Sequence, residues 1–145
     1  MWKQKDVDRL NKEVKPKQHK YRAKKVISNG VTYDSTREFN FKVALDKARI
    51  KYEMKYRFVL QKKFRYMGKG ISEIAIIPDF IIYDKSGNTC AIVDVKGMIT
   101  PQFRIKWKML QNAIRLSGKE IPLFLPSTNT ECDKVILQLI AIINQ

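Results

Sequence analysis

Hydrophobic and polar positions alternate along the chain with two different periods, and each period predicts a different kind of element. Segments with period two, or with apolar residues at every position, predict strands at residues 24–28, 31–33, 50–66, 71–83, 89–96 and 121–125. Apolar residues at helical spacing predict helices that begin at residue 35 and that cover about 101–116 and 133–144. The order of hairpin, helix, strands, helix, strand and helix is typical of an α/β or α+β domain.

Local turn signals set the borders of these elements. Asn29-Gly30 is typical of a two-residue hairpin turn, because both turn residues must take a positive φ angle. Ser35 and Glu38 have the spacing of a capping box at a helix start. Further turns are expected at residues 67–70 and 85–88. The apolar segments at residues 74–77, 80–83 and 91–93 predict strands in the middle of a sheet, where both faces are covered.

The predicted hairpin around Ser86-Gly87 brings two carboxylates together. With a turn of two or four residues, Asp79 and Asp94 become cross-strand partners, with Cβ atoms roughly 4.5–5.5 Å apart. Two like charges in such a position are destabilising unless a cation lies between them, and a divalent metal suits hard oxygen ligands. A bulged three-residue turn would break this register.

Two further residues extend the predicted site. Lys96 follows Asp94 by two residues and therefore lies on the same strand face, where it could activate a water and stabilise charge on a phosphate. Glu38, on the preceding helix, could supply another carboxylate, or it could serve only as a helix cap. Carboxylates, a lysine and Mg²⁺ are the set that phosphodiester hydrolysis requires.

These residues resemble a known motif. Pro78-Asp79, followed after fourteen residues by Asp94-Val95-Lys96, resembles the PD-(D/E)xK motif. That motif marks a nuclease superfamily that includes restriction enzymes, archaeal-type Holliday junction resolvases and phage endonuclease I. Residues 21–108 are also similar to small phage nuclease-like proteins and to the nuclease subunit of Tn7-type transposition, which has a Ser-x-x-Glu helix before its acids.

The resemblance implies a fold, a cofactor and an activity. The fold would be a restriction-endonuclease-like mixed central sheet flanked by helices. Glu38, Asp79, Asp94 and the carbonyl of Val95 would bind Mg²⁺, for which Mn²⁺ could substitute, and Lys96 would serve the nucleophile. The activity would be endonucleolytic cleavage of branched or Holliday-junction DNA in phage recombination or DNA processing. A transposition-type or nicking nuclease is the alternative.

The charge of the chain indicates its partner. Twenty-nine Lys and Arg face 14 Asp and Glu, giving a net charge of +15. Such an excess favours nucleic acid as the partner over an anionic membrane. We expect residues 1–20 to be a basic arm and residues 21–145 to be one nuclease-like domain. The expected DNA contacts are Lys24, Lys25, Arg104, Lys106 and Lys108. For the three residues on the helix at 101–116, a solvated helix face without a DNA contact is the alternative.

Composition also excludes some classes of protein. One histidine and two cysteines, Cys90 and Cys132, exclude a zinc finger, and we expect both cysteines in the core. No apolar run approaches the roughly 20 residues that span a bilayer, and no signal peptide is recognisable, so we expect a cytoplasmic protein. The apolar final helix predicts either deep burial or a homodimer interface. A non-catalytic DNA-binding protein and an RNA- or ribosome-associated protein are the remaining alternatives.

Overall fold

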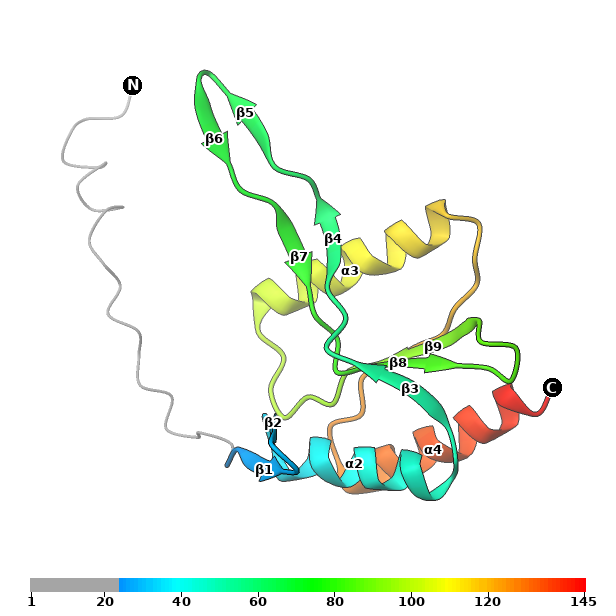
Figure 1. Cartoon of the computed structure of the whole chain (residues 1–145). Helices are drawn as coiled ribbons and strands as arrows, with labels where there is room; N and C mark the ends of the chain where they lie inside the picture. The colour runs from blue at the N-terminus through cyan, green and yellow to red at the C-terminus, as the bar shows by residue number, and fades with distance from the viewer. Residues whose placement is uncertain (1–23) are drawn as a thin grey trace.

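The computed structural model describes residues 24–145, which form an α+β fold with a mixed sheet and helices on both of its faces (Figure 1). In chain order the elements are β1 (Val26–Ser28), β2 (Val31–Tyr33), α2 (Thr36–Lys47), β3 (Lys51–Met54), β4 (Phe58–Gln61), β5 (Phe64–Tyr66), β6 (Lys69–Ile71), β7 (Ile74–Ile76), β8 (Phe80–Tyr83), β9 (Thr89–Val93), α3 (Pro101–Leu116), β10 (Leu123–Phe124) and α4 (Asn129–Ile143). The basic arm expected over residues 1–20 lies outside the described residues.

The central sheet has the strand order β10-β9-β8-β3. β10 runs parallel to β9, whereas the β9–β8 and β8–β3 pairs are antiparallel, so the sheet is mixed as predicted. Helices α2 and α4 cover one face, and α3 covers the other together with β4 and β7 (Figure 1). β8 and β9 are therefore enclosed on both sides, which explains their apolar residues at consecutive positions.

Two hydrophobic clusters fill the spaces on either side of the sheet. Successive strand residues alternate between them: Phe80 and Ile82 face α2 and α4, whereas Ile81 faces α3. On the α2–α4 side the buried residues are Phe41, Leu45, Ile50, Phe80, Ile82, Ala91, Val93, Val95, Cys132, Val135 and Leu139. On the α3 side they are Ile76, Ile81, Ile92, Trp107 and Leu110.

Strands β4 to β7 form a long hairpin that leaves the body of the molecule (Figure 1). The single strand expected over residues 71–83 is wrong, because this stretch contributes to three strands in three sheets. Pro78, which has no N–H to give to a ladder, lies in the break between β7 and β8. The turn at the far end is also shorter than predicted: Met67 and Gly68 take positive φ angles, and Lys69 and Gly70 already belong to β6.

Several local predictions are confirmed. Asn29 and Gly30 have φ angles of 50° and 75° and connect β1 to β2. Ser35 caps α2, and α3 has the expected bounds. Helix α4 begins at Asn129 rather than at residue 133, because Thr128 and Glu131 form a capping box that lengthens it.

The last helix and the two cysteines differ in how far they are buried. Helix α4 buries its Cys132, Val135 and Leu139 face within the chain, while Leu137 on its other side is 67% exposed. Cys132 is buried as expected, but Cys90 is only half-buried. Among the described residues, no helix is both long enough and apolar enough to cross a membrane.

A candidate metal centre at the end of the sheet

The β8–β9 hairpin carries Asp79 and Asp94 one position beyond its paired residues. The expected two- or four-residue turn is wrong, since the Asp84 N–H donates to the carbonyl of Asn88 (2.8 Å) and leaves three residues in the loop. A bulge follows at Cys90, so the pairing changes from Tyr83↔Thr89 to Ile82↔Ala91. The bulge compensates for the odd turn.

The predicted register is therefore recovered at the far end of the hairpin. Phe80 pairs with Val93, which makes Asp79 and Asp94 the next opposing positions. The Asp79 carboxylate turns toward the other strand, where its Oδ2 accepts a hydrogen bond from the Val95 N–H (2.8 Å). The Asp94 N–H donates to the carbonyl of Phe124 (3.0 Å), which fixes the end of β9 against the β10 segment.

Three acidic side chains are buried at this end of the sheet. Glu38 is 1% exposed, Asp79 5% and Asp94 1%, and they are the only charged residues buried in the part of the chain described. Both carboxylate oxygens of Asp94 lack a hydrogen-bond partner there. Burial of an ionised carboxylate is costly without compensation, so this arrangement requires a proton, a cation or both.

The two carboxylate oxygens of Glu38 have different contacts. Its Oε2 accepts a hydrogen bond from the Asp34 N–H (2.9 Å), while the Ser35 hydroxyl accepts one from the Glu38 N–H (3.1 Å), which together cap α2. Its Oε1 faces the acidic cluster and lies 2.9 Å from the Lys55 ammonium. The capping role and a place in the site are therefore both compatible with the geometry.

Lys55 supplies the cation at the centre of the cluster. Its Nζ lies 2.5 Å from Asp79 Oδ1, 2.9 Å from Glu38 Oε1 and 3.0 Å from Asp34 Oδ2. Lys55 has a φ angle of 57°, an unfavourable conformation for a residue with a side chain. Contacts to three carboxylates hold the residue in this conformation.

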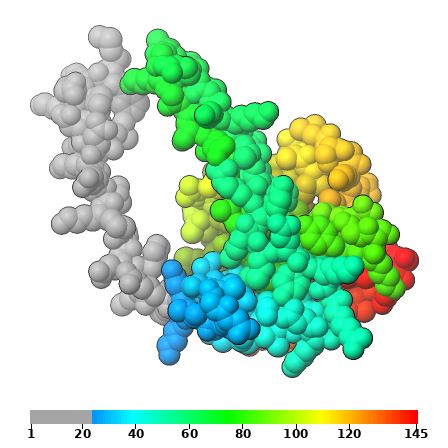
Figure 2. Space-filling view, viewed as in Figure 1, coloured from blue at the N-terminus to red at the C-terminus, as the bar shows by residue number. Residues whose placement is uncertain are grey.

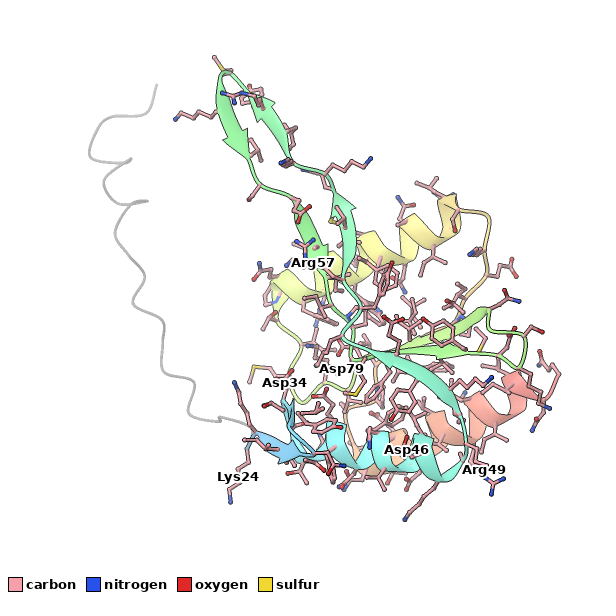
Figure 3. The ribbon with its side chains drawn as sticks, in the orientation of Figure 1. Lys24, Asp34, Asp46, Arg49, Arg57 and Asp79 are labelled. Carbon is pink, nitrogen blue, oxygen red and sulfur yellow. The ribbon has the colours of Figure 1, made fainter. Side chains whose placement is uncertain are left out.

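The same acids form a cluster with the dimensions of a metal site. Ligand oxygens of Asp34, Glu38 and Asp79 all lie within 4.8 Å of one another. Asp34 is exposed, so the cluster opens to solvent on the side of β2, and Figure 3 shows Asp34 and Asp79 next to each other at this edge. Hard carboxylate oxygens at this spacing suit Mg²⁺ or Mn²⁺.

Lys96 lies beside the cluster on the α3 side. Its ammonium is 3.5 Å from Asp94 Oδ2 and lies over the ring of Phe103, 4.4 Å from the ring centroid. The aromatic face and the carboxylate thus hold the lysine at the mouth of the site. Phe103 in turn stacks on Trp107, which is buried, so both aromatics belong to the α3 packing.

Burial and mutual repulsion change the acidity of the cluster. Burial, followed by the adjacent Asp79 carboxylate, raises the pKa of Asp94 to about 8. Burial and the charge of Asp79 also raise the pKa of Glu38, against the opposing effect of Lys55. Burial alone would lower the pKa of Lys55, but Asp79, Glu38 and Asp34 outweigh it and raise that pKa overall. The cluster thus holds protons and a cation tightly.

The expected DNA contacts lie at different places. On α3, Arg104 and Lys108 are exposed and four residues apart, so they share a face, whereas Lys106 is half-buried. Lys24 and Lys25 are exposed just before β1, and Figure 3 shows Lys24 extending away from the body of the protein. None of these basic side chains forms an ion pair within residues 24–145.

Of the predicted site residues, Asp79 opposes Asp94, Lys96 contacts Asp94, and Glu38 shares the Lys55 ammonium with Asp79. The cluster with metal-ligand spacing includes Asp34 in place of Asp94, and neither Asp34 nor Lys55 was foreseen. Lys55 lies 17 residues from Glu38 and 24 from Asp79 in the chain, and its contacts depend on how β3 returns to the sheet. Asp34 adjoins the Ser35 cap, and that position was the one signal that could have found it.

Comparison with known proteins gives a family without a function. The model of a family described as a protein of unknown function, DUF1064, matches residues 18–119. This range includes Asp34, Glu38, Lys55, Asp79, Asp94 and Lys96. No curated protein and no solved structure matches the chain.

Proposed function

We propose that this chain, which belongs to the DUF1064 family of proteins of unknown function, is a metal-dependent DNA endonuclease of the PD-(D/E)xK type. Glu38, Asp79 and Asp94 would hold Mg²⁺ or Mn²⁺, and Lys96 would assist the attacking water. The carbonyl of Val95 is a further proposed ligand.

One observation carries the proposal. Glu38, Asp79 and Asp94 are buried side by side at one end of the sheet in a chain with a net charge of +15. Glu38 lies in the first turn of α2, Asp79 precedes β8 and Asp94 follows β9, so three separate elements contribute to one acidic site. Burial of several carboxylates carries a desolvation cost, whereas a phosphodiesterase uses such a cluster to place a divalent metal against a phosphate.

The residues present fit a divalent cation. Asp94 has two buried oxygens without hydrogen-bond partners among the described residues, and Asp79 Oδ1 and Glu38 Oε1 already contact a cation, the Lys55 ammonium. A divalent metal bound there would polarise the phosphate and lower the pKa of a water. The Lys96 ammonium lies 3.5 Å from Asp94 Oδ2, where its charge would stabilise the negative charge that develops on the phosphate.

The preferred substrate within this class is branched DNA, including Holliday junctions. The described residues contain no separate sequence-reading domain, and the positive charge is spread over several elements. Such a distribution favours binding directed by backbone shape over direct reading of bases. A transposition-type or nicking nuclease would use the same site.

A second function is favoured by the position of Lys55. Its ammonium contacts three carboxylates and could replace the metal permanently, which would leave a DNA-binding protein without catalysis. An RNA-associated basic protein has less support, since it gives no reason to bury Asp79 and Asp94 at opposing positions.

A cleavage assay tests the proposal. Purified protein is incubated with Mg²⁺ or Mn²⁺ and, separately, a four-way junction, a fork, a linear duplex and a single strand. We expect metal-dependent cleavage, strongest on the branched substrates. Asp79→Asn, Asp94→Asn and Lys96→Ala should each reduce cleavage at least about 100-fold while DNA binding is kept.

The control is Asp133→Asn, which changes an exposed carboxylate on α4 and should cleave like the wild type. Normal cleavage by all three site variants would exclude this site as the active centre. Binding without cleavage on every substrate, together with no Mn²⁺ bound to the protein, would favour the non-catalytic alternative.

A further inference from the structure

The β4–β7 hairpin has a free outer half. Its lower ladder, β4 with β7, packs on α3, whereas every residue from Gln61 to Glu73 is exposed. Figure 2 shows this segment as a narrow column of atoms that extends beyond the body of the molecule. We call residues 61–73 the hairpin arm. A two-stranded ribbon without a packing partner is only marginally stable in water, so such an extension suggests a contact outside the chain.

The hairpin that carries the arm joins the body at the acidic site. Lys55 lies just before β4 and Asp79 lies just after β7, and their side chains are 2.5 Å apart. The Lys55 N–H also donates to the carbonyl of Asp79 (3.2 Å), which closes the base of the hairpin. The hairpin therefore connects the arm directly to the proposed metal site.

One face of the arm is aromatic and apolar. Phe64 pairs with Ile71 and Tyr66 with Lys69, and cross-strand partners lie on the same face of a ribbon. Phe64 is 45% exposed and Tyr66 64%, and Met67 at the tip is 86% exposed. The exposed parts of both rings are available for stacking.

The charge of the arm identifies the partner. It contains four basic residues, Lys62, Lys63, Arg65 and Lys69, and one acidic residue. That acid, Glu73, forms an ion pair with Arg57, and none of the four basic residues has an acidic partner in the part of the chain that the structure describes. Basic side chains next to exposed aromatic rings are the combination that binds single-stranded nucleic acid.

We propose that the hairpin arm binds an unpaired segment of the DNA substrate, with Phe64 and Tyr66 stacked on bases and the lysines on phosphates. The proposal rests on the proposed function, since it names the substrate of that site. A fully paired duplex would offer phosphates to the lysines but no free base faces to the rings. From Arg57 to Met67 an extended strand spans roughly 30 Å at about 3.3 Å per residue. The unpaired segment would thus lie within about nine base pairs of the cleaved phosphate.

Binding measured without metal tests this inference separately from catalysis. The full chain in EDTA is titrated with a fluorescent fork that carries a single-stranded branch and with a fully paired duplex of equal charge. We expect Phe64→Leu with Tyr66→Leu to weaken fork binding about tenfold or more, and to change duplex binding less than twofold. Leucine keeps an apolar side chain in the ribbon but removes the ring.

Two controls separate stacking from loss of structure. Phe64→Tyr with Tyr66→Phe keeps both rings and should bind the fork like the wild type. Lys62→Ala with Lys63→Ala should weaken binding of both DNAs, whereas Lys85→Ala, in the turn at the opposite end of β8, should affect neither. Circular dichroism is expected to be unchanged for all of these variants.

Three outcomes would overturn the inference. Equal loss of fork and duplex binding by the leucine variant would mean that the ribbon enters a groove of paired DNA. Unchanged binding of both DNAs, or a wild-type dimer that the leucine variant dissociates in sedimentation, would assign the apolar face to another use or to a second copy. A protein that binds the fork through its rings but never cleaves DNA would keep this inference and refute the nuclease.

Discussion

Among single residues, Asp94 has the least ordinary environment. Its carboxylate is 1% exposed, and burial and the neighbouring Asp79 raise its pKa to about 8 from 3.8 in a solvated chain. The folded protein therefore holds this proton more tightly than the unfolded chain. The resulting stability is fully present below about pH 4 and is lost as pH rises toward 8.

This linkage predicts a measurable pH dependence. In EDTA, the free energy of unfolding in urea should fall by on the order of a few kcal/mol between pH 5 and pH 8. Asp94→Asn should remove most of that decrease, because its amide does not ionise, while the exposed Asp133→Asn control should keep it. Mn²⁺ at pH 8 should restore stability to the wild type but not to Asp94→Asn. Parallel pH profiles for wild type and Asp94→Asn would contradict the assignment.

Lys55 predicts how strongly the site binds metal. A divalent ion that reaches Asp79 and Glu38 must displace or approach the Lys55 ammonium. Repulsion between two unit charges at 4 Å is about 1 kcal/mol even in water, and a divalent ion doubles it. Lys55→Gln should therefore bind Mn²⁺ at least about tenfold more tightly than the wild type in a calorimetric titration, with Lys51→Gln as the matched control on β3.

The same titration separates the two proposed functions. Weak binding by the wild type and tighter binding by Lys55→Gln would mean that the lysine competes with a metal at a working site. If neither protein binds Mn²⁺ at millimolar concentrations, Lys55 is a permanent counter-ion and the DNA-binding alternative gains.

Among the elements, those defined by neighbouring residues could be predicted from the sequence. Asn29-Gly30 indicates its hairpin because only a few residues tolerate positive φ angles, and Pro101 starts α3 where its missing N–H costs nothing. Alternation also predicted strands in the hairpin arm. It did not predict that they leave the body, because a period of two shows which side chains share a face and not what covers that face.

Pairing across the sheet could be predicted only in part. Asp79 and Asp94 oppose each other as expected, but a three-residue turn and the bulge at Cys90 produce this register together. The bulge has no clear sequence signal, whereas Gly87, with a φ angle of 85°, is the kind of residue that a three-residue turn favours at its third position. Each irregularity alone would have shifted Asp94 by one position. The contact between Lys55 and Asp79 depends on the path of β3 and the hairpin, which no local pattern reports.

Helix α3 yields a prediction about its exposed basic face. Arg104 and Lys108 are exposed on one side, next to the helix start that carries Phe103 and the Lys96 contact. If both side chains contact phosphates, Arg104→Ala with Lys108→Ala should lower the slope of log K against log salt by about two. The half-buried Lys106 should contribute less. Lys47→Ala with Lys85→Ala removes the same charge elsewhere and should leave the slope near the wild-type value.

In the whole molecule, the acidic site lies at the base of the hairpin that carries the arm. Lys55 and Asp79 close the base of the hairpin and also line the acidic cluster. The basic charge on α3 and on the arm lies on the side of the sheet away from α2 and α4 (Figure 1). A DNA molecule bound by both would be held along this side, with its backbone near the acids.

Without the arm, the position of the cut should therefore no longer depend on where the DNA branches. Residues 62–73 can be replaced by Asn-Gly, which joins the paired residues Gln61 and Ile74 through a two-residue turn. The core should be unaffected, since every deleted residue is exposed, so Mn²⁺ affinity and thermal stability should match the wild type.

On a fork labelled at each end, the wild type should cut within about nine base pairs of the branch. The shortened protein should cut paired DNA without a fixed distance from the branch. A cut at the same place in both proteins would show that the body alone selects the position, and the arm would then have no part in choosing the cleaved phosphate.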